Sequence, residues 1–385
     1  MEAAPEADGL SAFAGLDDWL RSRAGDEQFS GVVLVQRGVE TLFAGAYGPA
    51  SRRWPVLNTM ETRFDTASIT KLFTSVATLQ LVGEGRLSLD APITEIVDLA
   101  GTTISPEVRV RHLLTHTAGL ADDADEEAGE DYEALWVDRP VNSVIQTRDF
   151  LAQFAYKPAL FNPGERCRYC NVGYILVGLA IEEVTGTSYR EQVKSAVFAP
   201  AGMESSGFFD RRDAVTDVAE GWDPVVDESG ARTGWKSNIY SYPAIGSPDG
   251  GAHVTAGDMV RFQQAVRAGR LLSPELTEAF LTPQVMHHER QVERPGEAGA
   301  RVGWGKSAQI WYGFGLEFVR DPDGTVRSYY KDGINAGACG ISRYYPAARL
   351  DVAMLSNSAV GGVDAIDAIH DVVQQNHPEV GDSGF

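Results

Sequence analysis

Residues 69–79 carry the pattern of a buried helix, and this stretch constrains the chain more than any other. Apolar side chains recur there at steps of three and four: Ile69, Leu72, Phe73, Val76 and Leu79. A second stripe at the same spacing holds polar or small side chains: Ser68, Lys71, Ser75 and Thr78. Ser68 and Lys71 therefore face the same way, with Cβ atoms ~5–6 Å apart, and the amine can reach the hydroxyl.

The start of this helix favours a nucleophile at Ser68. Asp65 or Thr66 is the expected N-cap, which places Ser68 in the first turn. Backbone N–H groups are unsatisfied in a first turn, and the helix dipole is positive there. Such a position suits a hydroxyl whose attack on a carbonyl creates an oxyanion.

Lysine is rare in this chain, which has 27 arginines and six lysines. Arginine cannot act as a base in a protein, whereas a desolvated lysine near positive potential can lose its proton at neutral pH. Lys71, beside Ser68, is therefore a candidate base.

The length and composition predict a soluble globular protein that binds a small molecule. The chain has 385 residues, 43% of them hydrophobic and 23% charged, enough for one large or two intertwined units. Its longest apolar stretches fall far short of the ~20 residues that span a bilayer, so no membrane partner is expected. A formal net charge of -21 argues against nucleic acid as a partner. The N-terminal residues open with acid and lack a secretory signal pattern, which predicts a cytoplasmic location.

Acid is concentrated in residues 121–133, where eight of thirteen residues are Asp or Glu. A solvated loop is the simplest interpretation of this run. The alternative is a mobile flap over a site that prefers cationic substrates.

Metal, nucleotide and dinucleotide chemistry lack support, because the chain has no His-Glu-x-x-His, P-loop or complete Gly-x-Gly-x-x-Gly pattern. We therefore expect no cofactor and no metal. Cys167 and Cys170 form a lone CxxC and are expected to be buried free thiols. His112 and His116 have no Gly-x-Ser-x-Gly elbow to pair with, and we expect them to cap or pack a turn.

Two further stretches point to a known family. Residues 162–186 contain a Gly/Pro turn, then Tyr169-Cys170-Asn171, then an apolar helix, and residues 328–337 run along a strand through Lys331-Asp332-Gly333. Ser-x-x-Lys, Tyr-x-Asn and Lys-x-Gly in this order resemble the penicillin-recognising serine hydrolases: class C β-lactamases, D,D-peptidases, and related esterases and transacylases. The resemblance covers most of the chain and includes residues 110–120, 199–208, 247–262 and 312–318.

The resemblance implies a role for each matching residue. Ser68 would be the nucleophile that becomes acylated, and Lys71 its activating base or proton-shuttling partner. Tyr169 would be a second acid/base that serves the leaving group and then the second nucleophile. Asn171 would hydrogen-bond Lys71 or the substrate.

The third motif would border the site. Lys331 would tune Tyr169 electrostatically or hold a substrate carboxylate, and Gly333 completes the motif. The backbone N–H of Ile334 would join that of Ser68 in an oxyanion hole, where such donors are commonly worth ~3–4 kcal/mol.

Asp332 departs from the family pattern, because β-lactamases and D,D-peptidases typically have a small hydroxyl residue there. Its charge would lie beside a site meant to receive a carboxylate, which argues against lactam recognition. Alternatively, the side chain turns outward, since neighbours on a strand alternate faces.

The expected fold class is α/β (α+β), with an antiparallel sheet flanked by N- and C-terminal helices plus a mostly helical lobe, as in the β-lactamase/transpeptidase fold. Strands at residues 31–38 and 40–48 are expected to pair with C-terminal strands at 310–357, and helices near 10–23 and 362–376 to cover the sheet. The sheet lobe would comprise about 1–75 and 250–385, and the helical lobe about 75–250, in a single catalytic unit over residues 1–385.

The expected function is that of a serine acyl-enzyme hydrolase or acyltransferase acting on an ester or amide of a small molecule. Esterase or transacylase activity is favoured over β-lactamase or D-amino-acid peptidase activity. A catalytically inactive binding protein is the alternative from a different functional class.

Overall fold

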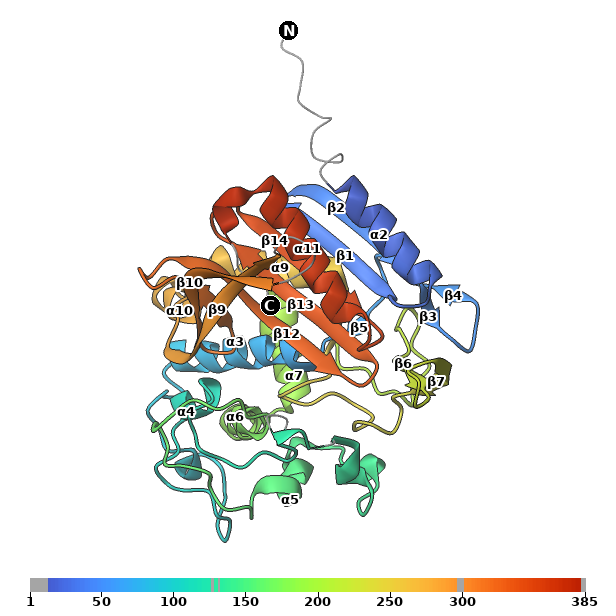
Figure 1. Cartoon of the computed structure of the whole chain (residues 1–385). Coiled ribbons are helices and arrows are strands. Elements are labelled where there is room, and N and C mark those ends of the chain that lie inside the picture. Colours follow the sequence, from blue (N-terminus) through green and yellow to red (C-terminus); the bar gives the residue numbers. More distant parts are fainter. Residues whose placement is uncertain (1–12, 126–127, 131, 296–300, 382–385) are drawn as a thin grey trace.

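The structure of the chain is a computed structural model that describes residues 13–125, 128–130, 132–295 and 301–381. Its main element is an eight-stranded antiparallel sheet in the order β2-β1-β14-β13-β12-β11-β10-β9 (Figure 1). The strands are β1 (Gly31–Arg37), β2 (Glu40–Tyr47), β9 (Val285–Pro295), β10 (Arg301–Tyr312), β11 (Glu317–Arg320), β12 (Val326–Asn335), β13 (Ala338–Tyr345) and β14 (Leu350–Ser356).

The predicted pairing between the two ends of the chain is confirmed. β1 lies between β2 and the last strand, β14, with Gly31 opposite Ser356 and Gln36 opposite Asp351. Strands from both ends of the chain therefore lie side by side in one sheet.

Both faces of the sheet are buried, as the alternation along β1 requires. Val33 and Val35 face α2 (Ala14–Gly25) and α11 (Gly362–Asn376) in one hydrophobic cluster, which confirms the two expected flanking helices. Val32 and Leu34 belong to the other cluster, which includes α9 (Ala256–Arg267). Figure 1 shows α2 and α11 side by side on one face, with α9 and α10 (Pro274–Phe280) behind the sheet.

The buried helix expected at residues 69–79 is α3 (Thr70–Gly83), which lies between the sheet and the helical half of the molecule (Figure 1). Eleven of its fourteen residues are buried, and it packs against α6, α7 and α10. Because α3 is covered on all sides, its polar stripe must find partners inside the protein.

Between α3 and α9 most of the regular structure is helical, as expected, with long irregular segments between the helices; a hairpin of β6 (Trp222–Val226) and β7 (Arg232–Ser237) also lies there. Its helices are α4 (Val110–Leu114), α5 (Leu151–Phe154), α6 (Val172–Thr185), α7 (Tyr189–Val193) and α8 (Ala199–Ala201), with a π-helical turn at Lys194–Phe198. Short 3-10 turns span Ala67–Ile69, Ile93–Glu95, Tyr132–Trp136, Val141–Ser143, Thr147–Phe150 and Pro378–Val380. There are also two small antiparallel pairs: the local pair of β3 (Pro49–Ser51) with β4 (Val56–Leu57), and β5 (Phe64–Asp65) with β8 (His253–Val254). Within the described residues, no helix has both the length and the apolar composition needed to cross a bilayer.

Candidate active site

Ser68 lies in a tight turn in front of α3, at the junction of the helix and strand β5. This turn, η1 (Ala67–Ile69), is a 3-10 helix and not the first α-helical turn that the sequence predicts. Thr66 is its N-cap residue and makes no side-chain capping bond, whereas the preceding Asp65 binds the first N–H of the turn: its Oδ1 accepts the N–H of Ala67 at 2.8 Å. Ala67 has a φ of +43°, a left-handed conformation that costs a residue with a Cβ about 1–2 kcal/mol.

Lys71 is fully buried, and three oxygen atoms lie within hydrogen-bond distance of its Nζ. Its Nζ lies 3.0 Å from Ser68 Oγ, 2.8 Å from Asn171 Oδ1 and 2.7 Å from the backbone oxygen of Asp249. The expected pairing of Ser68 and Lys71 along the helix is therefore present, and Asn171 contacts the lysine as the family resemblance implies. Asn171 lies at the start of α6, which brings the second motif to the first.

Tyr169 contacts the same serine from the other side. Its hydroxyl donates to Ser68 Oγ at 2.7 Å. Its ring lies between two lysines, with Lys71 Nζ 5.2 Å and Lys331 Nζ 5.1 Å from the ring centroid. Ser68 Oγ thus stands between two groups that can exchange protons with it.

Lys331 is engaged by carboxylates on its own sheet. Its Nζ lies 2.6 Å from Glu317 Oε1 and 3.0 Å from Asp332 Oδ1. Burial alone would lower the pKa of Lys331, but the charges of Asp332 and Glu317 outweigh it and hold this pKa well above its ordinary value. One interpretation of the sequence is that the Asp332 side chain turns outward. In the structure it instead contacts Lys331.

Gly333 allows β12 to lie directly against the nucleophile turn. A Cβ at this position would be 2.4 Å from the backbone oxygen of Thr66 and 2.8 Å from the backbone nitrogen of Ser68. Any larger residue would push the strand away from the turn. Ile334, whose backbone N–H is the second expected oxyanion donor, is the residue after Gly333 on the same strand.

His116 is a part of the site to which sequence analysis assigned only a structural role. Its Nδ1 accepts the backbone N–H of Cys170 at 3.1 Å, and its ring centroid lies 4.6 Å from that of Tyr169. Burial, together with the charges of Lys71 and Lys331, lowers the pKa of His116 well below its ordinary value, so the ring is neutral at pH 7. His112 is elsewhere and caps α4, where its Nδ1 accepts the N–H of Arg109.

The interpretation of residues 121–133 as a solvated loop is wrong for its first part. Asp122 is buried under the start of α6, where its carboxylate accepts the N–H groups of Asn171 at 2.7 Å and Val172 at 3.0 Å. Asp123 is also buried, and its Oδ2 accepts the hydroxyl of Tyr132 at 2.8 Å. Asp122 therefore fixes the residue that contacts Lys71.

Burial also perturbs these two carboxyl groups. It raises the pKa of Asp123 to about 6, with a further contribution from Asp249. Burial and the charge of Asp123 raise the pKa of Asp122 well above its ordinary value. Three other residues of the expected flap, Glu126, Glu127 and Asp131, lie outside the described residues.

Ser68 opens onto a cavity with an empty volume of about 560 Å³. Aromatic and charged side chains line it together: Tyr132, Phe150, Tyr242, Asp65, Arg211 and Asp249. Across the described residues, His, Cys, Asp and Glu do not form a group of three or more that could hold a metal ion. The three cysteines are free thiols; Cys170 is buried as expected and Cys339 is also buried, but Cys167 is partly exposed.

Comparisons with known proteins agree with this geometry. The sequence model of the Beta-lactamase family matches residues 16–376. Esterase EstB of Burkholderia gladioli is 30% identical over 298 residues, which cover 71% of this chain and 74% of the esterase. The crystal structure of a penicillin-binding protein from Bacillus halodurans has a TM-score of 0.80 and 36% identity, covering 91% of this chain and 99% of that protein. EstCE1, described as a hydrolase with promiscuous acyltransferase activity, has a TM-score of 0.70 over 91% of this chain and 95% of its own, and at 22% identity it shows the fold alone.

Proposed function

Since the chain belongs to the β-lactamase family of serine hydrolases, we propose that it forms an acyl-enzyme on Ser68 from an ester or amide of a small molecule. The observation that carries this proposal is the position of Ser68 Oγ, 3.0 Å from Lys71 Nζ and 2.7 Å from the hydroxyl of Tyr169. Both distances are within the reach that direct proton transfer requires.

In the acylation step, Ser68 Oγ attacks the substrate carbonyl while its proton passes to the uncharged amine of Lys71. The carbonyl oxygen becomes an oxyanion, which the backbone N–H groups of Ser68 and Ile334 would stabilise by ~3–4 kcal/mol each. The bond to the leaving group then breaks, and Tyr169 gives its proton to the departing oxygen or nitrogen. The cation beside the phenolate that this leaves is Lys331, whose Nζ lies 5.1 Å from the ring centroid and whose charge Glu317 and Asp332 offset.

Deacylation reverses these roles. Tyr169 takes a proton from the incoming water, alcohol or amine, whose oxygen or nitrogen attacks the acyl carbon. The ester bond to Ser68 then breaks, and Ser68 Oγ takes back its proton from the ammonium of Lys71, which restores both groups. Water gives hydrolysis, whereas an amine or alcohol gives acyl transfer. Which one occurs depends on how well water is excluded from the acyl-enzyme.

We favour an ester over a β-lactam as the substrate. The charge of Lys331 is already balanced by Glu317 and Asp332, so a substrate carboxylate would meet an ammonium group with two carboxylates beside it. The 30% identical relative is an esterase, which agrees with this preference. Transfer to an amine is the second candidate activity of the same site.

Labelling with a fluorophosphonate tests the proposal. We expect one adduct on the wild-type chain, at Ser68, and none on Ser68→Ala. Ser75→Ala is the matched control, because Ser75 is buried on the same helix but bonds to Tyr174, and this variant should label fully. A full-occupancy adduct on Ser68→Ala would contradict the assignment, and a wild-type chain that neither labels nor turns over any ester or amide would indicate an inactive binding protein.

A further inference from the structure

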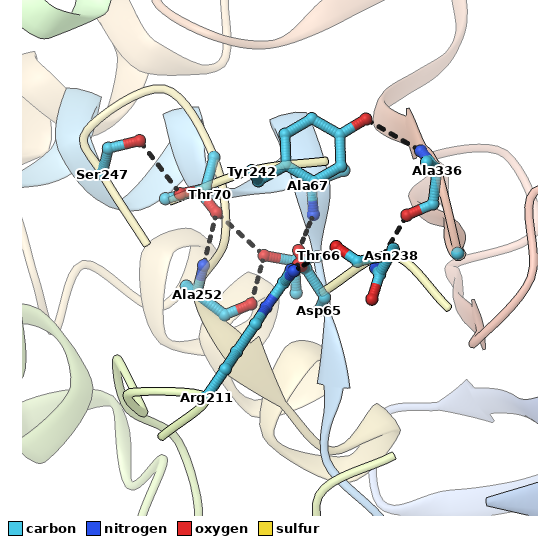
Figure 2. A network of polar contacts seen from close by, with 12 residues as sticks. Asp65, Thr66, Ala67, Thr70, Arg211, Asn238, Tyr242, Ser247, Ala252 and Ala336 are labelled. Carbon is cyan, nitrogen blue, oxygen red and sulfur yellow. Dashed lines mark hydrogen bonds and ion pairs between the residues drawn. The ribbon is translucent and has the colours of Figure 1, made fainter. Parts of the chain in front are cut away.

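A chain of hydrogen bonds joins the nucleophile turn to the end of β12 (Figure 2). It begins at Asp65, whose Oδ1 accepts the N–H of Ala67 at 2.8 Å and whose Oδ2 accepts Arg211 Nη2 at 3.0 Å. Arg211 Nη1 donates to the backbone oxygen of Asn238 at 2.9 Å. Asn238 Nδ2 in turn donates to the backbone oxygen of Ala336 at 2.8 Å. The steps described above give this chain no role.

The two ends of this chain of hydrogen bonds, Ala67 and Ala336, are next to the two proposed oxyanion donors. Ala67 immediately precedes Ser68, and its left-handed φ of +43° sets the direction of the following N–H. Ala336 follows Ile334 by two residues, and it is held on both sides, because the hydroxyl of Tyr242 accepts its N–H at 2.8 Å. Gly333 also contacts Ser68 directly, so the strand and the nucleophile turn are connected both by this contact and by the chain of hydrogen bonds.

The middle of the chain is an ion pair largely shielded from solvent. The side chains of Asp65 and Arg211 are 10% and 19% exposed, and both line the cavity that contains Ser68. Both oxygens of the Asp65 carboxylate accept hydrogen bonds, and the planar guanidinium of Arg211 donates to two partners. Such charged groups hold their geometry better than neutral or flexible groups. Such a pair can therefore fix the distance between the two elements that it connects.

We propose that Asp65 and Arg211 are positioning residues that keep the N–H groups of Ser68 and Ile334 in register as one oxyanion hole. The inference rests on the proposed function. Oxyanion donors act only within ~2.7–3.1 Å of the oxygen that becomes charged, so a small shift of one donor relative to the other weakens both bonds. Because the oxyanion exists only in the transition state and tetrahedral intermediate, loss of register lowers kcat and leaves KM nearly unchanged.

The test compares Asp65→Asn and Arg211→Gln with the wild-type enzyme, using an aryl acetate and the matching thionoester, in which sulfur replaces the carbonyl oxygen. Rates are given per active site, titrated with a fluorophosphonate. We expect kcat for the acetate to fall ~10–100-fold, up to the effect of losing one oxyanion donor, with KM within ~3-fold. In the same variants, kcat for the thionoester should fall much less, because its sulfur accepts hydrogen bonds weakly and the oxyanion hole stabilises it little.

Arg267→Gln is the matched control. Arg267 is also 19% exposed and forms an ion pair with a buried carboxylate, Asp351, but it joins α9 to β14. This variant should lose stability in the same way while keeping the ratio of ester to thionoester rates. If Asp65→Asn does not fold, Asn238→Asp tests the far end of the chain, since it replaces the donor to Ala336 by an acceptor.

An unchanged kcat per titrated site in the folded variants would overturn the inference, and so would equal losses on both substrates, which would place the effect on the nucleophile or base. Failure of the proposed function gives a different result. In that case the wild-type chain would not label at Ser68 or hydrolyse the acetate at all, and this inference would fall with it.

Discussion

Replacing Asp332 by serine should shift the enzyme toward substrates that carry a carboxylate. Lys331 Nζ lies 3.0 Å from Asp332 and 2.6 Å from Glu317, so with all three groups ionised one positive charge faces two negative ones. A substrate carboxylate bound to Lys331 would lie about 5 Å from that of Asp332, and at an effective dielectric constant of about 20 their repulsion is about 3 kcal/mol. This corresponds to a factor of about 100 in kcat/KM. Because the Asp332 side chain is 24% exposed, screening by water lowers the expected gain to ~10–100-fold.

The assay measures kcat/KM for a chromogenic cephalosporin, which carries a carboxylate, and for a neutral aryl ester. In Asp332→Ser the ratio of cephalosporin to ester activity should rise, mainly through the cephalosporin. Asp332→Asn keeps the shape of the side chain and removes only its charge, so it should raise the ratio almost as much. A ratio that stays constant in both variants, or a wild-type enzyme that prefers the cephalosporin to every ester, would refute the electrostatic argument.

Three other changes test the remaining parts of the site. Lys71→Arg should fail as badly as Lys71→Ala in steady-state ester hydrolysis, because the site needs a removable proton and arginine does not release one; comparable turnover by the arginine variant would show that positive charge suffices. Tyr169→Phe should lower kcat by roughly 10²-fold, the scale of general acid–base catalysis, and an unchanged kcat with a good substrate would argue against its role. For Asp123→Asn the readout is stability: because the pKa of Asp123 is raised to about 6, ionisation of the buried carboxyl costs stability as pH rises from about 4 through 6. In urea unfolding, the free energy of unfolding of this variant minus that of wild type should therefore rise as the pH is raised from 4 to 7. A difference that stays constant with pH would contradict the direction of the pKa shift.

The sequence predicts those parts of the fold and site that have a local pattern. The helix period around Lys71 and the alternation in β1 identify α3 and the sheet, and three short motifs identify Ser68, Tyr169 and Lys331. The bond between Asp65 and Arg211 joins residues 146 positions apart, and neither has a neighbouring residue that marks it. Nothing in a single sequence indicates that two such distant residues are in contact.

The acidic run shows why composition can mislead. Eight acids in thirteen residues predict solvation, because an isolated buried carboxylate is very costly. Asp122 is nevertheless buried, since the first N–H groups of α6 have no intrahelical acceptor and its carboxylate supplies one. The need is created by a helix 49 positions further along the chain, so charge density alone cannot reveal it.

Of the four groups His116, Lys331, Lys71 and Tyr169, the proposed mechanism uses only the last two for proton transfer to and from Ser68. His116 is neutral, and its Nδ1 is occupied by a backbone N–H, so it packs against Tyr169 without competing as a base. Lys331 is held in its charged form by two carboxylates, which leaves it no capacity to accept a proton. Lys71 and Tyr169 remain, and both contact Ser68 Oγ directly. The pair of carboxylates that discourages an anionic substrate is thus the same pair that keeps Lys331 charged beside the phenol, so substrate preference and acid–base chemistry are coupled through one ammonium group.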